Sequence, residues 1–179
     1  MKNSIVLLIV FFCTSNVIIG RQSDTLLIKP GKGVDNIVVH RSSQEAVKKF
    51  KKVTFITSKG TGIACGTFGS RRFRSAKYKN DSLGLMFEFK TSLVRAPFQI
   101  FHKLKLQEII VSKKGLTDNG LVIGKSTKQD VIALYGLPPN WKNEGFIAYY
   151  EKGISLSFDD NGIISEIQIF SPYMEQTVF

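Results

Sequence analysis

One stretch of this chain occurs twice, and an internal duplication constrains a fold more than any other sequence feature. Residues 39–50 read VHRSSQEAVKKF, and residues 123–134, which lie 84 positions further on, read IGKSTKQDVIAL. Both copies have an apolar residue, a basic residue, two hydroxyl residues and a valine at matching positions. Each copy is followed by alternating segments that close with residues 106–111 (LQEIIV) and 164–169 (ISEIQI). We therefore expect a fold built from two related units.

Each copy predicts a short helix with a capping box at its start. Ser42 with Glu45, and Ser126 with Gln129, have the three-residue spacing at which the cap hydroxyl and the later side chain each reach the other residue's backbone N–H. Gly136 and the two prolines behind it predict the end of the second helix. The end of the first helix carries no comparable signal.

The segments after each helix alternate in hydrophobicity, as half-buried strands do. The expected strands cover residues 83–89, 104–111, 146–150, 154–158 and 163–170. The sequence DDNG at 159–162 predicts a tight hairpin turn. A single short unit would bury too little apolar surface to be stable alone. We therefore predict an α+β fold of two tandem units, each a helix plus an antiparallel meander, which share one sheet and one core.

Residues 1–20 resemble a secretion signal. They have a short basic start, an apolar run from Ile5 to Phe12, and the small residue Gly20 before polar residues. The run is shorter than the ~20 residues needed to span a bilayer. We expect the chain to be exported, into the periplasm or the medium. Cys13 leaves open the alternative of lipid attachment to the cell envelope.

The remaining chain divides into two predicted units of opposite charge. Residues 21–115 carry 20 Lys and Arg against 6 Asp and Glu, whereas residues 116–179 carry 4 against 8. The basic field of the first unit attracts anionic partners. We expect a protein partner with an acidic surface, or else an anionic membrane surface. Nucleic acid is not an expected partner, because the chain is predicted to leave the cytoplasm.

Two expanded loops distinguish the first unit from the second. One lies between residues 57 and 77 and is rich in glycine, and the other lies between the strands expected at 83–89 and 104–111. Additions of this kind usually lie on the surface and carry specific contacts. The predicted partner-binding residues are Arg71, Arg72, Phe73, Arg74, Lys77, Tyr78, Arg95 and Phe98. A solvated strand with alternating exposed charges is the other interpretation of the basic run.

Residue patterns typical of catalysis or metal binding are missing from the sequence. His40 and His102 are the only histidines, and neither has Cys or carboxylate residues at ligand spacing. The sequence GKST at 124–127 lacks the earlier glycine of a phosphate-binding loop. A Gly-x-Ser-x-Gly nucleophile motif is also absent. We therefore expect no cofactor, no metal and no enzymatic activity.

The second unit resembles the SmpA/OmlA (BamE-like) family. Thr127, Val131, Gly136 and Pro138 match the spacing of its signature, whereas the first unit keeps Val47 but lacks the Gly and Pro. A tandem of such units is similar in architecture to the β-lactamase inhibitor proteins, in which one concave sheet faces a protein target. The resemblance implies a non-enzymatic protein-binding module of the cell envelope. Two alternatives are an inhibitor or immunity protein that neutralises a toxin or enzyme, and a membrane-peripheral lipoprotein.

Overall fold

The fold was obtained as a computed structural model that describes residues 25–50, 53–56, 61–66, 69–92, 104–138 and 145–172, without the side chains of 61–66, 69–74 and 91–92. The helices in these ranges are α1 (Gln44–Lys49), α2 (Lys128–Tyr135) and the single 3₁₀ turn η1 (Tyr150–Lys152). The strands are β1 (Leu26–Lys29), β2 (Gly33–Val34), β3 (Ile37–Val38), β4 (Thr54–Ile56), β5 (Thr61–Gly66), β6 (Gly69–Asn80), β7 (Leu85–Ser92), β8 (Lys105–Val111), β9 (Gly115–Thr117), β10 (Phe146–Tyr149), β11 (Ile154–Phe158) and β12 (Ile164–Phe170).

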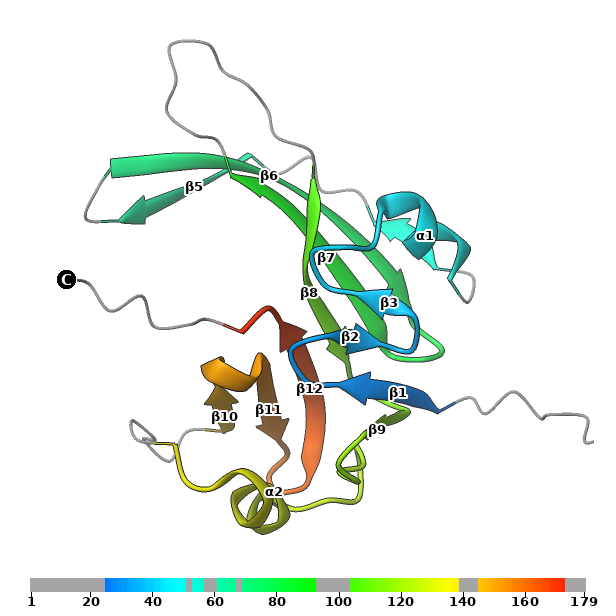
Figure 1. Cartoon of the computed structure of the whole chain (residues 1–179), viewed down its shortest axis with the longest axis vertical. Helices are drawn as coiled ribbons and strands as arrows, with labels where there is room; N and C mark the ends of the chain where they lie inside the picture. The colour runs from blue at the N-terminus through cyan, green and yellow to red at the C-terminus, as the bar shows by residue number, and fades with distance from the viewer. Residues whose placement is uncertain are drawn as a thin grey trace, which may run out of the picture.

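The strands form two sheets (Figure 1). An eight-stranded antiparallel sheet has the order β10-β11-β12-β8-β7-β6-β4, with β5 as a hairpin partner of β6. A four-stranded sheet has the order β3-β2-β1-β9, in which β1 and β9 run parallel. The predicted α+β class is confirmed. The prediction of one sheet made of two short meanders is wrong, because residues 26–38, to which no strand was assigned, form three strands of a second sheet.

The expected loop between residues 57 and 77 is largely strand. β5 pairs with β6 from Thr61↔Arg74 to Gly66↔Gly69. Glycine lowers strand propensity, which is why this segment was predicted as a loop. β6 also pairs with β7 along eight residue pairs. That pairing holds β6 extended and gives β5 a neighbour to bond, whatever the side chains of β5 prefer.

The hydrophobic core lies between the eight-stranded sheet on one side and the helices with the four-stranded sheet on the other. The Tyr78 hydroxyl donates to Gln44 Oε1 of α1 at 2.8 Å, and the Tyr149 hydroxyl donates to the Gly136 carbonyl behind α2 at 2.7 Å. A Cβ at Gly115 of β9 would lie 3.2 Å from Val111 Cγ1 of β8, so the two sheets approach closely there. One cluster of buried side chains includes residues from both sides of the predicted unit boundary, which itself falls inside β9.

Both helices begin with a side-chain cap, one residue later than predicted. The caps are Ser43, whose hydroxyl accepts from the Ala46 N–H, and Thr127, which forms a complete capping box with Asp130. The predicted boxes Ser42–Glu45 and Ser126–Gln129 are therefore wrong. Ser42 Oγ instead accepts from the Val38 N–H at 2.8 Å, and Ser126 Oγ accepts from the Val122 N–H at 3.0 Å. These hydroxyls close the turn that leads into each helix.

The turn before each helix has the same backbone geometry in the two halves of the chain. His40 has φ 63° and Gly124, at the matching position, has φ 77°. The His40 N–H donates to the Leu106 carbonyl of β8, and the Gly124 N–H donates to the Ile164 carbonyl of β12, each at 2.8 Å. Each turn is thus fastened to the start of the closing strand of its own half.

The capping box predicts how the stability of the protein responds to acid. The Thr127 N–H and hydroxyl donate to the Asp130 carboxylate at 2.7 and 2.9 Å and lower its pKa. A carboxyl whose folded pKa is lowered stabilises the fold above its unfolded pKa, and this contribution is lost as pH falls through the folded pKa. Urea unfolding of Asp130→Asn should therefore show reduced stability at pH 7, and the difference from the wild type should shrink as the pH falls below about 3.9, the ordinary pKa of an aspartate.

The control for this experiment is Asp160→Asn, which makes the same change of charge at an exposed turn residue. It should run parallel to the wild type across the pH range. A constant difference between Asp130→Asn and the wild type at every pH would contradict the assignment.

Candidate functional site

The face of the eight-stranded sheet that points away from the core is the candidate functional site. Paired residues of antiparallel strands lie on one face and side chains alternate along each strand, so the register assigns the members of this face. They are Ser75, Lys77, Lys79, Met86, Glu88, Lys90, Lys105, Glu108, Ile110, Phe146, Ala148, Ser155, Ser157, Glu166, Gln168 and Phe170. We call this surface the open face.

Charged side chains cross the open face as a connected row, which we call the ion ladder. It comprises Lys77, Glu88, Lys90, Glu108 and Gln168. Lys77 Nζ lies 3.6 Å and Lys90 Nζ 3.0 Å from the Glu88 carboxylate. Lys90 Nζ also lies 3.9 Å from the Glu108 carboxylate, to which the Gln168 side-chain amide donates. The ladder thus ties β6, β7, β8 and β12 together through side chains.

The ladder has an accessible positive layer over a buried negative layer. The side chains of Lys77 and Lys90 are 38% and 39% exposed, whereas those of Glu88 and Glu108 are 11% and 16% exposed. The long lysine stems cover the carboxylates and keep the ammonium groups in water. A partner approaching this face therefore meets positive charge first. Lys105, which is exposed on the neighbouring strand, adds to that charge.

A third carboxyl group lies at the β12 side of the open face. Burial, and then the nearby Glu108 carboxylate, raise the pKa of Glu166. Both effects disfavour its charged form. Acidification therefore protonates Glu166 earlier than an ordinary glutamate and makes the open face more positive.

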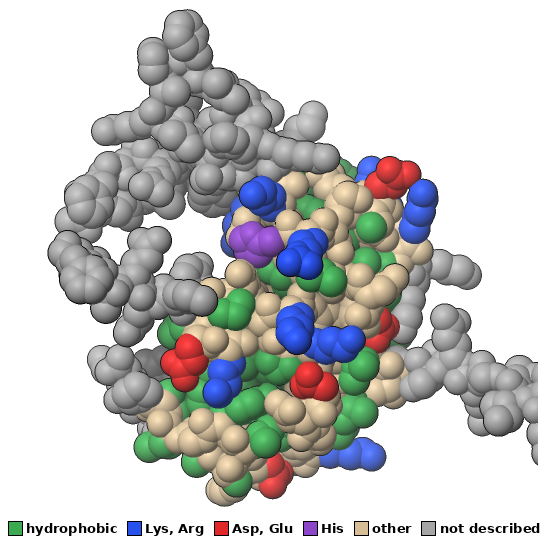
Figure 2. Space-filling view, viewed as in Figure 1, with side chains coloured by type: hydrophobic (Ala, Val, Ile, Leu, Met, Phe, Trp, Pro, Cys, Tyr) green, Lys and Arg blue, Asp and Glu red, His purple; other side chains and the backbone are tan. Residues whose placement is uncertain are grey.

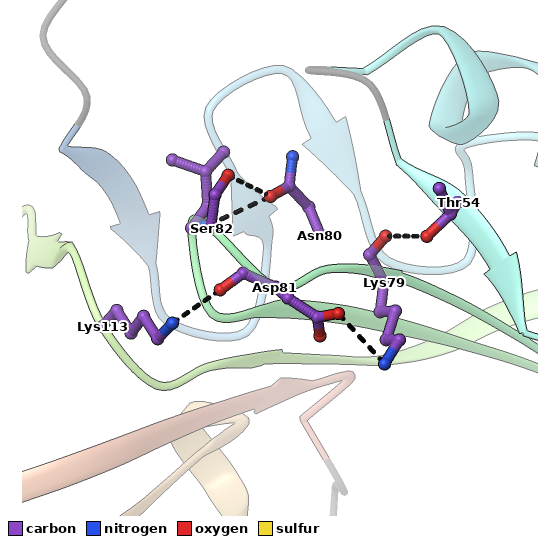
Figure 3. A network of polar contacts seen from close by, with 7 residues as sticks. Thr54, Lys79, Asn80, Asp81, Ser82 and Lys113 are labelled. Atoms are coloured by element: carbon purple, nitrogen blue, oxygen red, sulfur yellow. Dashed lines mark hydrogen bonds and ion pairs between the residues drawn. The ribbon is translucent and has the colours of Figure 1, made fainter.

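The turn between β6 and β7 fixes the end of the strands that carry the ladder (Figure 3). The Asn80 side-chain oxygen accepts from the Ser82 hydroxyl at 2.6 Å and from the Leu83 N–H at 3.1 Å. Lys113, which follows β8, donates to the Asp81 carbonyl at 2.7 Å, and Lys79 pairs with the Asp81 carboxylate at 3.1 Å. These bonds hold β6, β7 and the residues after β8 in one arrangement.

Aromatic side chains lie at the other end of the open face. The rings of Tyr150 and Phe170 are 6.0 Å apart, and Tyr150 is 59% exposed. Phe146, on strand β10, is 44% exposed. Exposed aromatic residues are typical of protein interfaces, because a ring buries much area while losing little conformational entropy. This surface therefore combines a basic end with an aromatic end.

The structure separates the binding residues that the sequence predicted. Lys77 lies on the open face, within the ion ladder. Tyr78 is only 1% exposed and packs in the core against Phe89, so it is not at a partner-facing surface. The backbone of Arg71, Arg72, Phe73 and Arg74 lies in β6, but their side chains are outside the described atoms. Arg95, Phe98 and Cys13 lie outside the described residues, as does the predicted signal at 1–20.

Sequence reasoning missed most of the ion ladder. Glu88 and Glu108 lie in segments that were predicted as strands, and Lys90 directly follows the first of them. Alternation with the apolar residues around them could have placed these side chains on the polar face. Their mutual contacts depend on the register of β7 and β8, which includes a bulge between Glu88 and Phe89. Strand register between distant segments has no local signal in a single sequence.

The other features considered in the sequence, namely the histidines, the GKST sequence and a membrane-spanning segment, give no further site in the described residues. Burial, and then the charge of Lys105, lower the pKa of His40, whose described neighbours form no metal site. Within the described ranges no group of three or more His, Cys, Asp or Glu side chains could hold a metal ion. Thr127 in the GKST sequence is a helix cap. Neither α1 nor α2 has the length of a membrane-spanning helix, and the described part of the chain contains no other candidate.

Charge is unevenly spread over the molecule. In the view of Figure 2, Lys and Arg side chains gather over the upper half of the described surface, which is the half drawn around α1 and β6 in Figure 1. This distribution agrees with the excess of basic residues before residue 116. Comparison with protein-family models, curated proteins and solved structures found no match for this chain.

Proposed function

We propose that this chain is an exported, non-enzymatic protein-binding module that uses the open face to bind a partner with an acidic surface. The observation that carries the proposal is the layered ion ladder, in which accessible lysines cover carboxylates that are mostly buried. Such a surface presents positive charge while holding its side chains in place. Complementary charge accelerates association and selects among partners.

The fold supplies a rigid platform for this role. The open face belongs to an eight-stranded sheet whose opposite face is packed against two helices and a second sheet. On its central strands, the side chains of the ion ladder pair with one another, which holds them in place. A binding surface that is ordered before the partner arrives loses less entropy on association.

We also propose that the platform arose from two related units, 21–115 and 116–179, of the kind seen in BamE-like and β-lactamase inhibitor proteins. The recurrence of the capped helix and of the turn before it, 84 positions apart, supports this view. The first unit then supplies the basic end of the open face, and the second supplies the aromatic end. Neutralisation of a toxin or enzyme would be one use of such a surface.

Site-specific crosslinking tests the proposal. A photoreactive amino acid at Ile110, in the middle of the open face, should capture a protein partner in envelope extract, whereas one at the exposed residue Ala133 of α2 should not. Lys77→Glu/Lys90→Glu should weaken binding of the captured partner at least tenfold, about 1.4 kcal/mol, and raised salt should weaken the wild type.

The matched control is Lys32→Glu/Lys125→Glu, which makes the same change of net charge at exposed positions outside the open face. It should bind as the wild type does. Equal capture at Ile110 and Ala133, or equal weakening by the two double variants, would refute the use of the open face. Turnover of a substrate by the pure protein would refute the non-enzymatic role.

A further inference from the structure

We propose that two copies of this chain associate through β10, so that their eight-stranded sheets join into one across a two-fold axis. β10 is the last strand in the order of that sheet, and no described residue pairs with its outer edge. An uncovered strand edge offers a row of backbone donors and acceptors to another chain. This inference concerns self-association and does not depend on the proposed function of the open face.

The hydrogen-bond pattern shows which backbone groups of β10 point outward. The Phe158 N–H donates to the Gly145 carbonyl at 2.9 Å, so this pair is of the hydrogen-bonded type. Hydrogen-bonded pairs alternate along an antiparallel ladder, so Ile147 and Tyr149 bond to β11. The N–H and C=O groups of Phe146 and Ala148 therefore point to the free edge.

The outward N–H and C=O groups of β10 are complementary to the same groups on a second copy of the chain. In an antiparallel pair with Phe146 opposite the partner's Ala148, both residues exchange two hydrogen bonds, and the two-fold axis repeats the exchange. The register also places a large side chain opposite a small one, since both residues lie on the open face. Phe146 is 44% exposed and can pack over the partner's alanine.

The β10 edge lacks the features that usually prevent such pairing. Natural edge strands often carry lysine, proline or a bulge. The sequence FIAY at 146–149 has no charge and no proline, and its pairing with β11 is regular. Exposed apolar side chains surround it: Leu137 is 58% and Tyr150 is 59% exposed. The Tyr149 hydroxyl donates a hydrogen bond to the Gly136 carbonyl, which keeps the next residue, Leu137, close to β10.

The charge distribution favours this edge over the opposite one. The chain has a net charge of +11, which opposes association of two copies. The excess of basic residues lies before residue 116, whereas β10 belongs to the segment that carries 4 basic and 8 acidic residues. Because β10 and β4 are at opposite ends of the strand order, joining at β10 holds the two basic halves far apart.

Sedimentation of the purified chain between 1 and about 200 μM tests this inference, given that weak specific dimers dissociate near micromolar concentration. The wild type should shift from the monomer mass to twice that mass. Phe146→Lys should raise the dissociation constant at least tenfold, because it places a charge at the joint. Phe55→Lys, the same substitution on the half-exposed Phe55 of β4, should leave association unchanged.

Disulfide trapping tests the proposed register of the two β10 strands. It also tests the association itself if Phe146→Lys fails to fold. In a background with Cys13 and Cys65 changed to serine, Phe146→Cys/Ala148→Cys should give a covalent dimer on oxidation, since such pairs have Cα atoms about 5.5 Å apart. The pair Thr54→Cys/Ile56→Cys on β4 should not. A monomeric wild type at about 200 μM, dissociation by Phe55→Lys alone, or crosslinking only at β4 would overturn the proposal.

Discussion

Phe87→Ala should lower the free energy of unfolding by about 3–5 kcal/mol, the cost typical of removing a buried ring from a core. Phe87 is fully buried on β7, and its ring meets that of Phe50, beside α1, edge to face at 5.9 Å. The cavity would lie where α1 packs on the sheet and directly beneath Glu88. Chemical denaturation should show a lower midpoint, and binding at the open face should weaken as the ladder loses its support.

The matched control is Phe55→Ala, which removes the same ring from a side chain that is 50% exposed on the edge strand β4. Its cost should stay below about 1.5 kcal/mol, because much of that ring is already in water. Equal losses for the two variants would mean that the core does not lie on the Phe87 face of the sheet. The open face would then have been assigned to the wrong side.

The second half of the fold follows closely from local sequence signals. The strands expected at 154–158 and 163–170 and the turn between them agree with β11, β12 and the loop before Ile164. Alternating side chains, DDNG and Gly136 each act over a few residues, so a single sequence displays them. The helix caps were predicted with the right chemistry but one residue early, because adjacent hydroxyls compete for the cap and only the backbone decides between them.

The four-stranded sheet could not be predicted in the same way. β1 pairs in parallel with β9, which lies about ninety residues later in the chain, and β2 and β3 have two residues each. Such short segments carry no periodic pattern of their own. β2 pairs locally with β1 and β3, but the sheet is completed by the long-range pairing of β1 with β9, for which no local sequence signal exists.

The same limit applies to the candidate site. Charge led to the first half of the chain and to Lys77, which lies on the open face, but it did not distinguish Lys77 from its buried neighbour Tyr78. The alternation of β6 sends these two side chains to opposite faces, and the core face could be chosen only once β7 was in register. Glu88 was not predicted as a site residue. A carboxylate inside an apolar strand can be recognised as part of a charged surface only once the lysines that pair with it, opposite and beside it, are known.

Gly153→Ala should cost about 2–5 kcal/mol, because it combines backbone strain of about 1–2 kcal/mol with a steric clash of about 1–3 kcal/mol. Gly153 has φ 65°, and a Cβ there would lie 2.3 Å from the Phe170 carbonyl oxygen and 2.6 Å from Gly31 Cα. Its carbonyl accepts from the Gly31 and Phe170 N–H groups at 3.2 and 3.0 Å. The glycine therefore joins the β1–β2 turn of the small sheet to the end of β12 in the large one.

Gly162→Ala separates the two contributions. Gly162 lies in the turn between β11 and β12 and has φ 73°. A Cβ added at Gly162 would have no other atom within 4 Å. Its substitution should cost only the strain of about 1–2 kcal/mol. The excess cost of Gly153→Ala in urea unfolding then measures the contact between the two sheets. If the two alanine variants lose equal stability, the N-terminal turn does not rest on the end of β12.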